Sequence, residues 1–132
     1  MLRINESKLG DAAALLARVL LSTIFIIDGW GKMAIYAAAQ AYMEQFSVPS
    51  MLLPLVILTE VGCGLAVLAG WQTRWAALAL AGFSILAAVI FHHNFGNRNE
   101  MLHFQKDLAI AGGLLALVAF GAGRWSLDGR RS

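Results

Sequence analysis

Long apolar stretches alternate with short polar ones along the chain, and the apolar stretches have the length of membrane-spanning helices. A helix rises about 1.5 Å per residue, so about 20 residues cross a hydrocarbon layer about 30 Å thick. Between the first two stretches, apolar side chains recur at helical spacing among polar ones, which is typical of a helix in the membrane interface. The pattern predicts four spans, at residues 12–33, 52–71, 75–93 and 102–122, and an interfacial helix at residues 36–47.

The connections between the predicted spans are short, and residues 72–74 leave room only for a tight turn. Short connections join neighbouring antiparallel helices. The sequence therefore predicts an all-α fold, a four-transmembrane-helix up-and-down bundle that forms a single membrane domain over residues 1–132.

Composition supports lipid as the solvent of this chain. Of its 132 residues, 59% are hydrophobic and 14% are charged, with a mean hydropathy of +0.68, whereas soluble domains are about 25% charged. A cleaved signal peptide is the alternative for the first stretch. Asp28 and Lys32 argue against it, because they fall where such a peptide has neutral residues.

The distribution of basic residues predicts the orientation. An even number of spans places both termini on one side, together with most of the basic residues: Arg3, Lys8, Arg74, Arg124, Arg130 and Arg131. Lys32, Arg98 and Lys106 fall on the other side. Cytoplasmic loops carry an excess of Lys and Arg, so we expect cytoplasmic N and C termini. The same topology puts Trp71, Trp75 and Trp125 at the inner interface and Trp30 near the outer one, as an aromatic belt requires.

Charge and cysteine content narrow the function classes. The formal net charge of +2 comes from dispersed basic residues, which does not suggest nucleic-acid binding. Cys63 is the single cysteine, so no dithiol pair can form, and we expect it to be a small apolar filler between helices. The chain is not a self-sufficient dithiol enzyme.

Glu60 is a lone carboxylate near the middle of the second span. An ionisable group at that depth usually faces a protein interior or a water-filled cavity and has a partner, because a charge exposed to lipid costs several kcal/mol. We expect Glu60 to face the bundle interior within reach of Lys32, Asp28 or Asp107, with Lys32 its main partner.

Polar residues from every span converge in the outer half of the predicted bundle. Asp28 and Lys32 are four residues apart on one face of the first helix, where they can also simply neutralise one another. With Glu60, His92 and Asp107 they form a candidate binding site or proton relay. A metal site from His92, His93, His103 and Glu100 is disfavoured, because adjacent histidines point to different faces, and no metal is expected.

Two further sets of residues have predicted structural roles. Arg18 lies inside the first span near its cytoplasmic end, and we expect it to form an ion pair with Asp128 after the fourth span. Small residues let membrane helices approach closely. We expect such packing at Gly29, Gly62, Gly64, Gly112 and Gly113.

These residues and spacings resemble the DoxX family of small bacterial inner-membrane proteins, from about Leu15 to Asp128. The resemblance rests on Arg18, the Gly-x-x-Lys spacing of Gly29 and Lys32, Glu60 followed by Gly62 and Gly64, the turn from Gly70 to Arg74, Asp107 with Leu108, the pair Gly112 and Gly113, and the closing run from Gly123 to Asp128. Ala122 departs from the family, which often has proline there.

The resemblance implies a four-helix protein of the bacterial inner membrane, and some members are associated with thiosulfate:quinone oxidoreductases or with membrane complexes that handle sulfur and oxidative stress. Three functions stay open: a quinone-interacting subunit of an oxidoreductase, a non-catalytic anchor or scaffold for a soluble partner, and a small oligomeric transporter. We expect no covalently bound cofactor, with quinone as the candidate ligand. The expected partners are the lipid bilayer, other proteins of a membrane complex, and further copies of this chain in a homo-oligomer.

Overall fold

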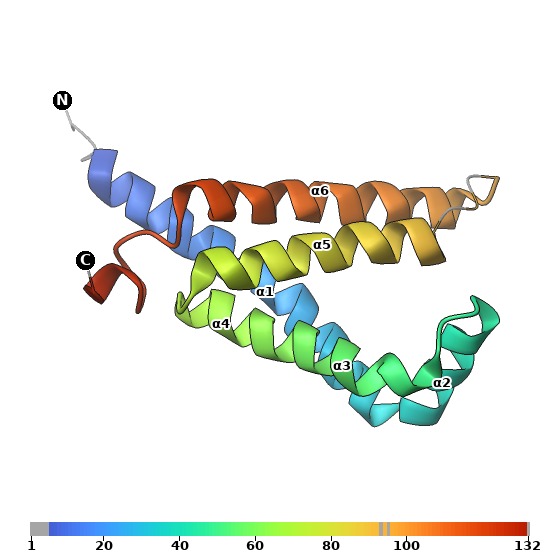
Figure 1. Ribbon diagram of the computed structural model, residues 1–132. Helices are drawn as coiled ribbons and strands as arrows, with labels where there is room; N and C mark the ends of the chain where they lie inside the picture. Colours follow the sequence, from blue (N-terminus) through green and yellow to red (C-terminus); the bar gives the residue numbers. More distant parts are fainter. Residues whose placement is uncertain (1–5, 93, 95, 132) are drawn as a thin grey trace.

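The computed structural model describes residues 6–92, 94 and 96–131, and this part of the chain is helical with irregular connections (Figure 1). The first span is α1, Glu6–Ala34, and the short helix α2, Tyr36–Gln45, follows it directly. The second span is built from four consecutive pieces: η1 (Ser50–Leu52), α3 (Leu53–Ile57), η2 (Leu58–Cys63) and α4 (Gly64–Ala69). The last two spans are α5, Thr73–Phe91, and α6, Arg98–Phe120, and the 3₁₀-helix η3, Gly129–Arg131, lies in the tail.

Within the described residues, four helical segments are long and apolar enough to cross a membrane: Lys8–Ala34, Ser50–Ala69, Thr73–Phe91 and Arg98–Phe120. The predicted all-α membrane fold is confirmed. The first and last spans begin earlier than predicted, because their polar first turns are also helical. In α6 the reason is a cap: the Asn97 side chain accepts hydrogen bonds from the N–H groups of Asn99 and Glu100, at 2.9 and 3.4 Å.

The spans run up and down, with the starts of α1 and α5 and the ends of α4 and α6 at one end of the molecule (Figure 1). The antiparallel helices α5 and α6 pack against each other along their length, and α1 packs mainly against η2 and α4. α2 turns away from α1 at the other end, beside η1. That the end with the termini is cytoplasmic stays a prediction.

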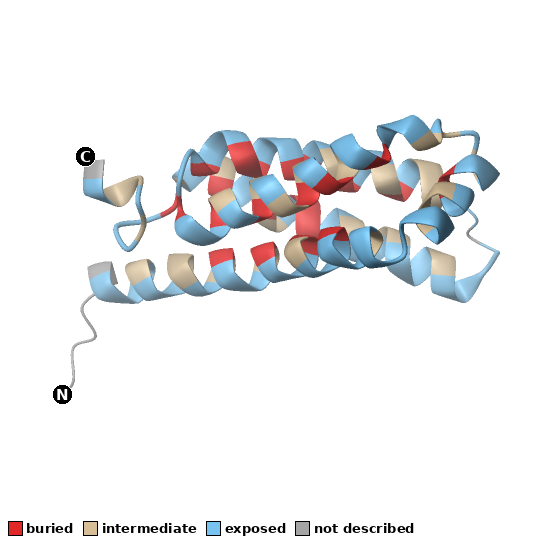
Figure 2. Cartoon of the chain, turned by 90° about the horizontal axis from the view of Figure 1, so that it is seen from below, coloured by how far each residue is buried: buried red, intermediate tan, exposed pale blue. Residues whose placement is uncertain are grey.

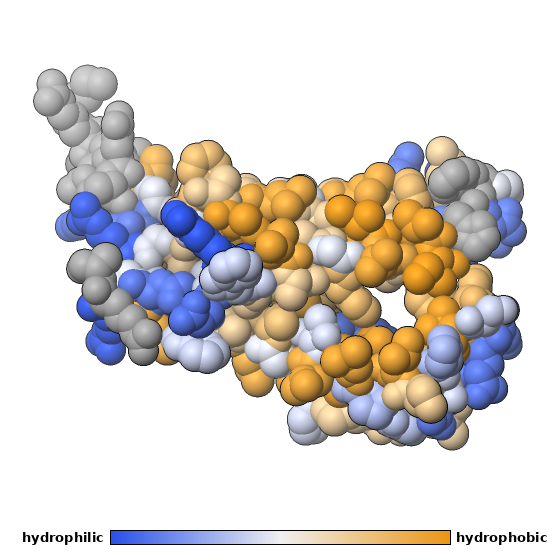
Figure 3. Space-filling model, viewed as in Figure 1, coloured by the Kyte–Doolittle hydropathy of each residue, from blue (hydrophilic) through white to orange (hydrophobic). Residues whose placement is uncertain are grey.

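Buried residues lie on the inward sides of the helices, and the outward sides are exposed (Figure 2). The core is made of small and aliphatic side chains between the spans, including Val67, Ala77, Leu80 and Leu114, all fully buried. Large apolar side chains cover much of the exterior, between more polar ends (Figure 3). A bundle that is apolar both inside and outside is suited to lipid as its solvent.

Glycines bring α1 close to its neighbours at three of the five predicted positions. A Cβ on Gly29 would lie 2.6 Å from Val61 Cγ2, one on Gly64 would lie 2.9 Å from Ile26 Cγ1, and one on Gly113 would lie 3.3 Å from a Leu21 methyl group. The predicted close packing is wrong for Gly62 and Gly112 within the described chain. Gly112 has open space around it, and Gly62 meets only Leu58 of its own segment, at an ordinary 3.7 Å.

The second span is not a uniform α-helix, since η2 is a π-helix. Sequence periodicity predicted one regular helix here. A π-helical turn holds an extra residue and rotates the side chains that follow it, and such turns recur at functional sites. The turn carries Glu60 at its third position.

Candidate functional site

Glu60 faces the bundle interior and accepts a hydrogen bond from Lys32 Nζ, as an ion pair between the first and second spans. The carboxylate is buried, with only 1% of the residue exposed, whereas the Lys32 side chain keeps 33% of its surface exposed. The predicted placement of Glu60 and the choice of Lys32 as its partner are therefore confirmed. Lys32 Nζ also lies 5.9 Å from the centre of the Phe83 ring on α5, within the range of a cation–π interaction.

Gly29 explains how this pair forms. A Cβ at that position would stand 3.1 Å from the Cβ of Glu60 and 3.3 Å from the backbone nitrogen of Val61. The bare backbone of α1 therefore lets η2 approach closely. Lys32 lies three residues further on, hence on the same helix face, and its long side chain reaches the carboxylate. In the Gly-x-x-Lys spacing, the glycine thus lets the two helices approach and the lysine supplies the positive charge that pairs with Glu60.

Asp28 lies on the same wall of the bundle but does not replace Glu60. The described ion pair of Lys32 is with Glu60, so the alternative in which Asp28 and Lys32 simply neutralise one another is wrong for this structure. Asp28 lines the cavity described below and acts electrostatically on both Glu60 and Asp107. It belongs to the cluster as a second carboxylate on α1.

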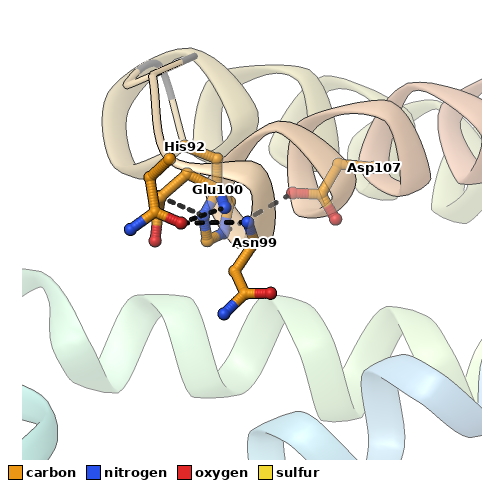
Figure 4. Close-up of polar contacts among 5 residues, drawn as sticks. His92, Asn99, Glu100 and Asp107 are labelled. Atoms are coloured by element: carbon orange, nitrogen blue, oxygen red, sulfur yellow. Dashed lines mark hydrogen bonds and ion pairs between the residues drawn. The ribbon is translucent and has the colours of Figure 1, made fainter.

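A second polar group lies where α5 ends and α6 begins (Figure 4). His92 Nδ1 is 3.0 Å from Glu100 Oε2, and His92 Nε2 is 3.9 Å from Asp107 Oδ2. The imidazole also stacks on His103, with ring centres 5.1 Å apart. Glu100 as the closest partner of His92 was not predicted from the sequence, although Glu100 lies in the first turn of α6, close to the end of α5. His93 lies outside the described residues.

Between these two groups lies a cavity of about 380 Å³. Its walls are largely apolar and come from α1, α2, the second span, α5 and α6, and the surface view shows an opening between α2 and α3 on one side and α5 and α6 on the other (Figure 3). All five predicted site residues line the cavity: Asp28, Lys32, Glu60, His92 and Asp107. The structure thus brings the whole predicted set to one space, and the role of that space stays a prediction.

An aromatic cluster holds α2 against the mouth of this cavity. Tyr42 stacks on Phe91 with ring centres 5.4 Å apart, and Phe46 contacts both rings, at 5.1 Å from Tyr42 and 5.0 Å from Phe91. Burial raises the pKa of the Tyr42 hydroxyl above its usual value, and the nearby negative charge of Glu100 raises it further. The sequence predicted the helix but not its contact with α5.

The lining of the cavity holds more acidic than basic side chains. Three carboxylates, those of Asp28, Glu60 and Asp107, face one lysine and one histidine. With His92 neutral, the formal sum of one positive and three negative charges is −2. Such a lining disfavours an anionic ligand and accepts a neutral or cationic one.

Arg18 occupies the opposite end of the bundle and is 1% exposed. Its guanidinium donates to the carbonyl oxygens of Leu68, at 3.0 Å, and Val67, at 3.5 Å, and to that of Trp125. The expected proximity to the tail is confirmed, but the bonds described for the guanidinium go to carbonyls. The predicted Arg18–Asp128 ion pair is therefore corrected to a nearby charge.

Asp128 has a different structural role at that end. Its carboxylate accepts the N–H groups of Gln72 and Thr73, both at 2.9 Å, and so caps the start of α5. Its own N–H donates to Gly70 O at 2.7 Å. Gly70 permits this turn because its φ of 72° is in the left-handed region. The tail thus closes over the turn between α4 and α5, with Arg18 beneath it.

Comparison with known proteins gives a consistent result. The DoxX family model matches residues 13–93. The chain is 50% identical over 121 residues to the inner membrane protein YqjF of Escherichia coli (strain K12). The aligned region covers 92% of this chain and 93% of that protein. The chain is 32% identical over 123 residues to the inner membrane protein YphA of the same strain, over 88% of each chain. No solved structure matches.

Proposed function

This chain belongs to the DoxX family and is a multi-pass inner-membrane protein, and from that premise we propose that it is the quinone-binding membrane subunit of an oxidoreductase complex. The observation that carries the proposal is the Lys32–Glu60 pair, in which a partly exposed proton donor meets a buried carboxylate in the lining of an apolar cavity. The sequences of YqjF and YphA support the membrane assignment alone, because their names state no reaction.

The cavity fits a quinone in size and polarity. Small-molecule sites usually measure about 300–1,000 Å³ and combine apolar walls with a few polar groups, and this one measures about 380 Å³. A quinone head group is a flat, uncharged ring with two carbonyl oxygens, and its tail is apolar. The apolar walls suit the ring and the first part of the tail, and the polar residues are placed to contact the oxygens.

The charge of the lining favours this ligand over a sulfur oxyanion. An anion such as thiosulfate would enter beside the carboxylates of Asp28, Glu60 and Asp107, with Lys32 already bound to one of them. Like charges in a site of low dielectric repel strongly. An uncharged ring avoids that repulsion, so the oxyanion chemistry associated with some family members is assigned to a partner protein.

The side chains supply binding and proton transfer. When bound, a quinone accepts two electrons and two protons. Lys32 Nζ is placed to donate a hydrogen bond to a carbonyl oxygen, and the Glu60 carboxyl group to hold a proton and release it. His92 and Asp107 at the outer end connect the cavity with the polar surface. Cys63 is the only cysteine in the sequence, so the chain has no dithiol, and electrons come from a partner.

The test uses the full chain in phosphatidylcholine nanodiscs with a short-chain ubiquinone analogue, whose binding is followed by quenching of tryptophan fluorescence. We expect Glu60→Gln and Lys32→Met to weaken binding at least about tenfold, which corresponds to about 1.4 kcal/mol. Glu44→Gln and Lys106→Met are matched controls, because these exposed residues lie outside the cavity lining. Both controls should bind as the unaltered protein does.

A filled cavity provides an independent variant. Ala87 lines the cavity and takes no part in the Lys32–Glu60 ion pair. Ala87→Phe should therefore fill the cavity and block binding while the ion pair remains. Absence of binding by the unaltered protein, or equal binding by all variants, rejects the proposal. Copurification with a soluble enzyme that survives Glu60→Gln would then support the anchor alternative.

A further inference from the structure

A second hollow, of about 370 Å³, lies at the opposite end of the molecule, where α5 begins and α6 ends. Its lining comes from the first turn of α5, the last residue of α6 and the tail: Gln72, Thr73, Arg74, Trp75, Phe120, Gly121, Ala122, Gly123, Asp128 and Gly129. None of these residues lines the cavity assigned to quinone. The hollow therefore needs its own explanation.

Arg74 supplies the positive charge of this hollow. Its guanidinium lies directly over the backbone of Gly121, where a Cβ would be 3.3 Å from both Nε and Nη2. Gly121 has a φ of 79° and lacks a side chain, so the planar group can rest there. No ion pair or hydrogen bond of the Arg74 side chain occurs within the part of the chain that the structure describes. The guanidinium of Arg74 is thus held at the hollow and available to bind an anionic group.

The nearby carboxylate does not compete for Arg74 in any described bond. Both oxygens of Asp128 accept N–H groups of the first turn of α5, at 2.9 Å each. Beside them, the Thr73 hydroxyl is buried and has no hydrogen-bond partner among the described residues. Buried polar groups usually have partners. The wall therefore offers a cation and an unused hydroxyl, which together suit a phosphate oxygen.

The rim of the hollow is apolar and aromatic. Trp75 is 73% exposed and Phe120 is 83% exposed, on the outward surface of the bundle. Exposed aromatic side chains at a helix end are typical of the membrane interface. A ligand in this position would have its charged group against Arg74 and its apolar part against Trp75 and Phe120. That division of polarity is the one found in a phospholipid.

We propose that this hollow binds the phosphodiester head group of an anionic phospholipid in the leaflet next to the chain termini. Arg74 pairs with the phosphate, and Trp75 and Phe120 contact the first part of the acyl chains. Anionic lipid is favoured over zwitterionic lipid because its head group brings a net negative charge to Arg74, the one cationic side chain in the described lining of the hollow. Basic pockets between helices are known to bind such head groups. The proposal is independent of the quinone function.

The experiment measures lipid retained by the full chain. The protein is extracted from nanodiscs containing equal amounts of phosphatidylglycerol and phosphatidylcholine, and bound lipids are counted by native mass spectrometry. We expect one retained phosphatidylglycerol, and at least a fivefold loss of it in Arg74→Gln. Arg124→Gln is the matched control, since it removes the same charge from the same end but does not line the hollow. It should retain the lipid within twofold of the unaltered protein.

Further arms separate the remaining outcomes. Trp75→Ala should reduce retention without changing charge, and inorganic phosphate at 10 mM (about a hundredfold excess over protein) should not displace the lipid if acyl contacts contribute. Equal loss in Arg74→Gln and Arg124→Gln, equal retention of phosphatidylcholine, or displacement by phosphate alone rejects the proposal. Thermal unfolding of each variant shows that the fold is kept, which is expected because Arg74 and Trp75 are exposed.

Discussion

Lys32 and Glu60 bind each other across two neighbouring spans, one helical turn beyond the point where Gly29 brings those spans together. Removing the lysine leaves a carboxylate that is 1% exposed without its described partner. An unpaired charge of that kind is costly inside a protein and in lipid. The pair is therefore a structural element as well as the centre of the proposed site.

We first predict that Lys32→Met lowers the free energy of unfolding by about 3 kcal/mol, the lower end of the cost of breaking a buried pair. Lys106→Met should change it by less than about 0.5 kcal/mol, because Lys106 is exposed. Thermal and denaturant unfolding in detergent micelles measures both. The double variant Lys32→Met with Glu60→Leu should recover most of the loss, and additive losses would contradict the pairing.

Much of this site could be predicted from the sequence, because the depth of a charged residue in the membrane and its helix face limit which partners it can reach. Glu60 had to face inward, since an acid within an apolar span needs a partner, and Lys32 was the cation at a compatible depth. The π-helical turn that carries Glu60 was not predictable. The turn packs against α1, a tertiary contact that the sequence does not display, and the apolar pattern around it fits an α-helix equally well.

The glycine positions give a second prediction. Gly29→Ala places a methyl group 2.6 Å from Val61 Cγ2, so α1 and η2 must move apart. Overpacking of this kind costs about 1–3 kcal/mol. Gly112→Ala meets nothing within 4 Å and should stabilise α6 by up to about 1 kcal/mol through its higher helix propensity.

Unfolding of both alanine variants under one set of conditions checks this contrast. Gly29→Ala should also reduce quinone-analogue binding, because it displaces the segment that carries Glu60. A neutral Gly29→Ala variant would show that the close approach of the two spans is not required. A destabilised Gly112→Ala variant would instead indicate that this exposed face packs against another chain.

Arg18 supports a third prediction, at the end with the termini. Arg18→Gln shortens the side chain and removes its bonds to the carbonyls of Val67, Leu68 and Trp125. Each buried carbonyl left without a donor costs about 1–3 kcal/mol, so the tail should detach before the bundle unfolds. Hydrogen exchange of the peptide covering residues 124–131 should become at least about tenfold faster, because its amides bond to Ala69 and Gly70.

Arg98→Gln is the control for this experiment, since Arg98 is an exposed residue at the other end of the molecule. Arg18→Lys separates charge from geometry, because a lysine keeps the charge but lacks the planar fork that reaches the three carbonyls. Exchange in Arg18→Lys should be intermediate. Full protection in Arg18→Lys would return the prediction to a simple charge interaction with Asp128, the form that the sequence suggested.

The difference at Arg18 has a physical origin that a sequence does not display. Spacing placed an arginine and an aspartate at one end of the bundle, and opposite charges suggested a pair. The turn at Gly70, however, exposes carbonyls that need donors, and the start of α5 exposes N–H groups that need acceptors. Arg18 and Asp128 each satisfy backbone groups of this turn. Such groups become visible only once the chain path is known.

The last prediction concerns Tyr42 and the contact of α2 with the mouth of the cavity. Burial against Phe91, and secondarily the charge of Glu100, raise the pKa of the Tyr42 hydroxyl. An ultraviolet absorbance titration should show a tyrosine that ionises above the usual value of about 10, and Tyr42→Phe should remove that step. Glu100→Gln should shift the step down only partly, because burial is the larger cause.

The sign of the stability effect follows from the same shift. The hydroxyl holds its proton more tightly in the folded chain, so above the usual value the unfolded chain ionises first and stability falls as the pH rises through the raised pKa. In Tyr42→Phe this alkaline loss should be smaller. If Tyr42 instead titrates as a free tyrosine, α2 does not stay docked on α5. The cavity would then lose the aromatic contact between Tyr42 and Phe91 in its lining.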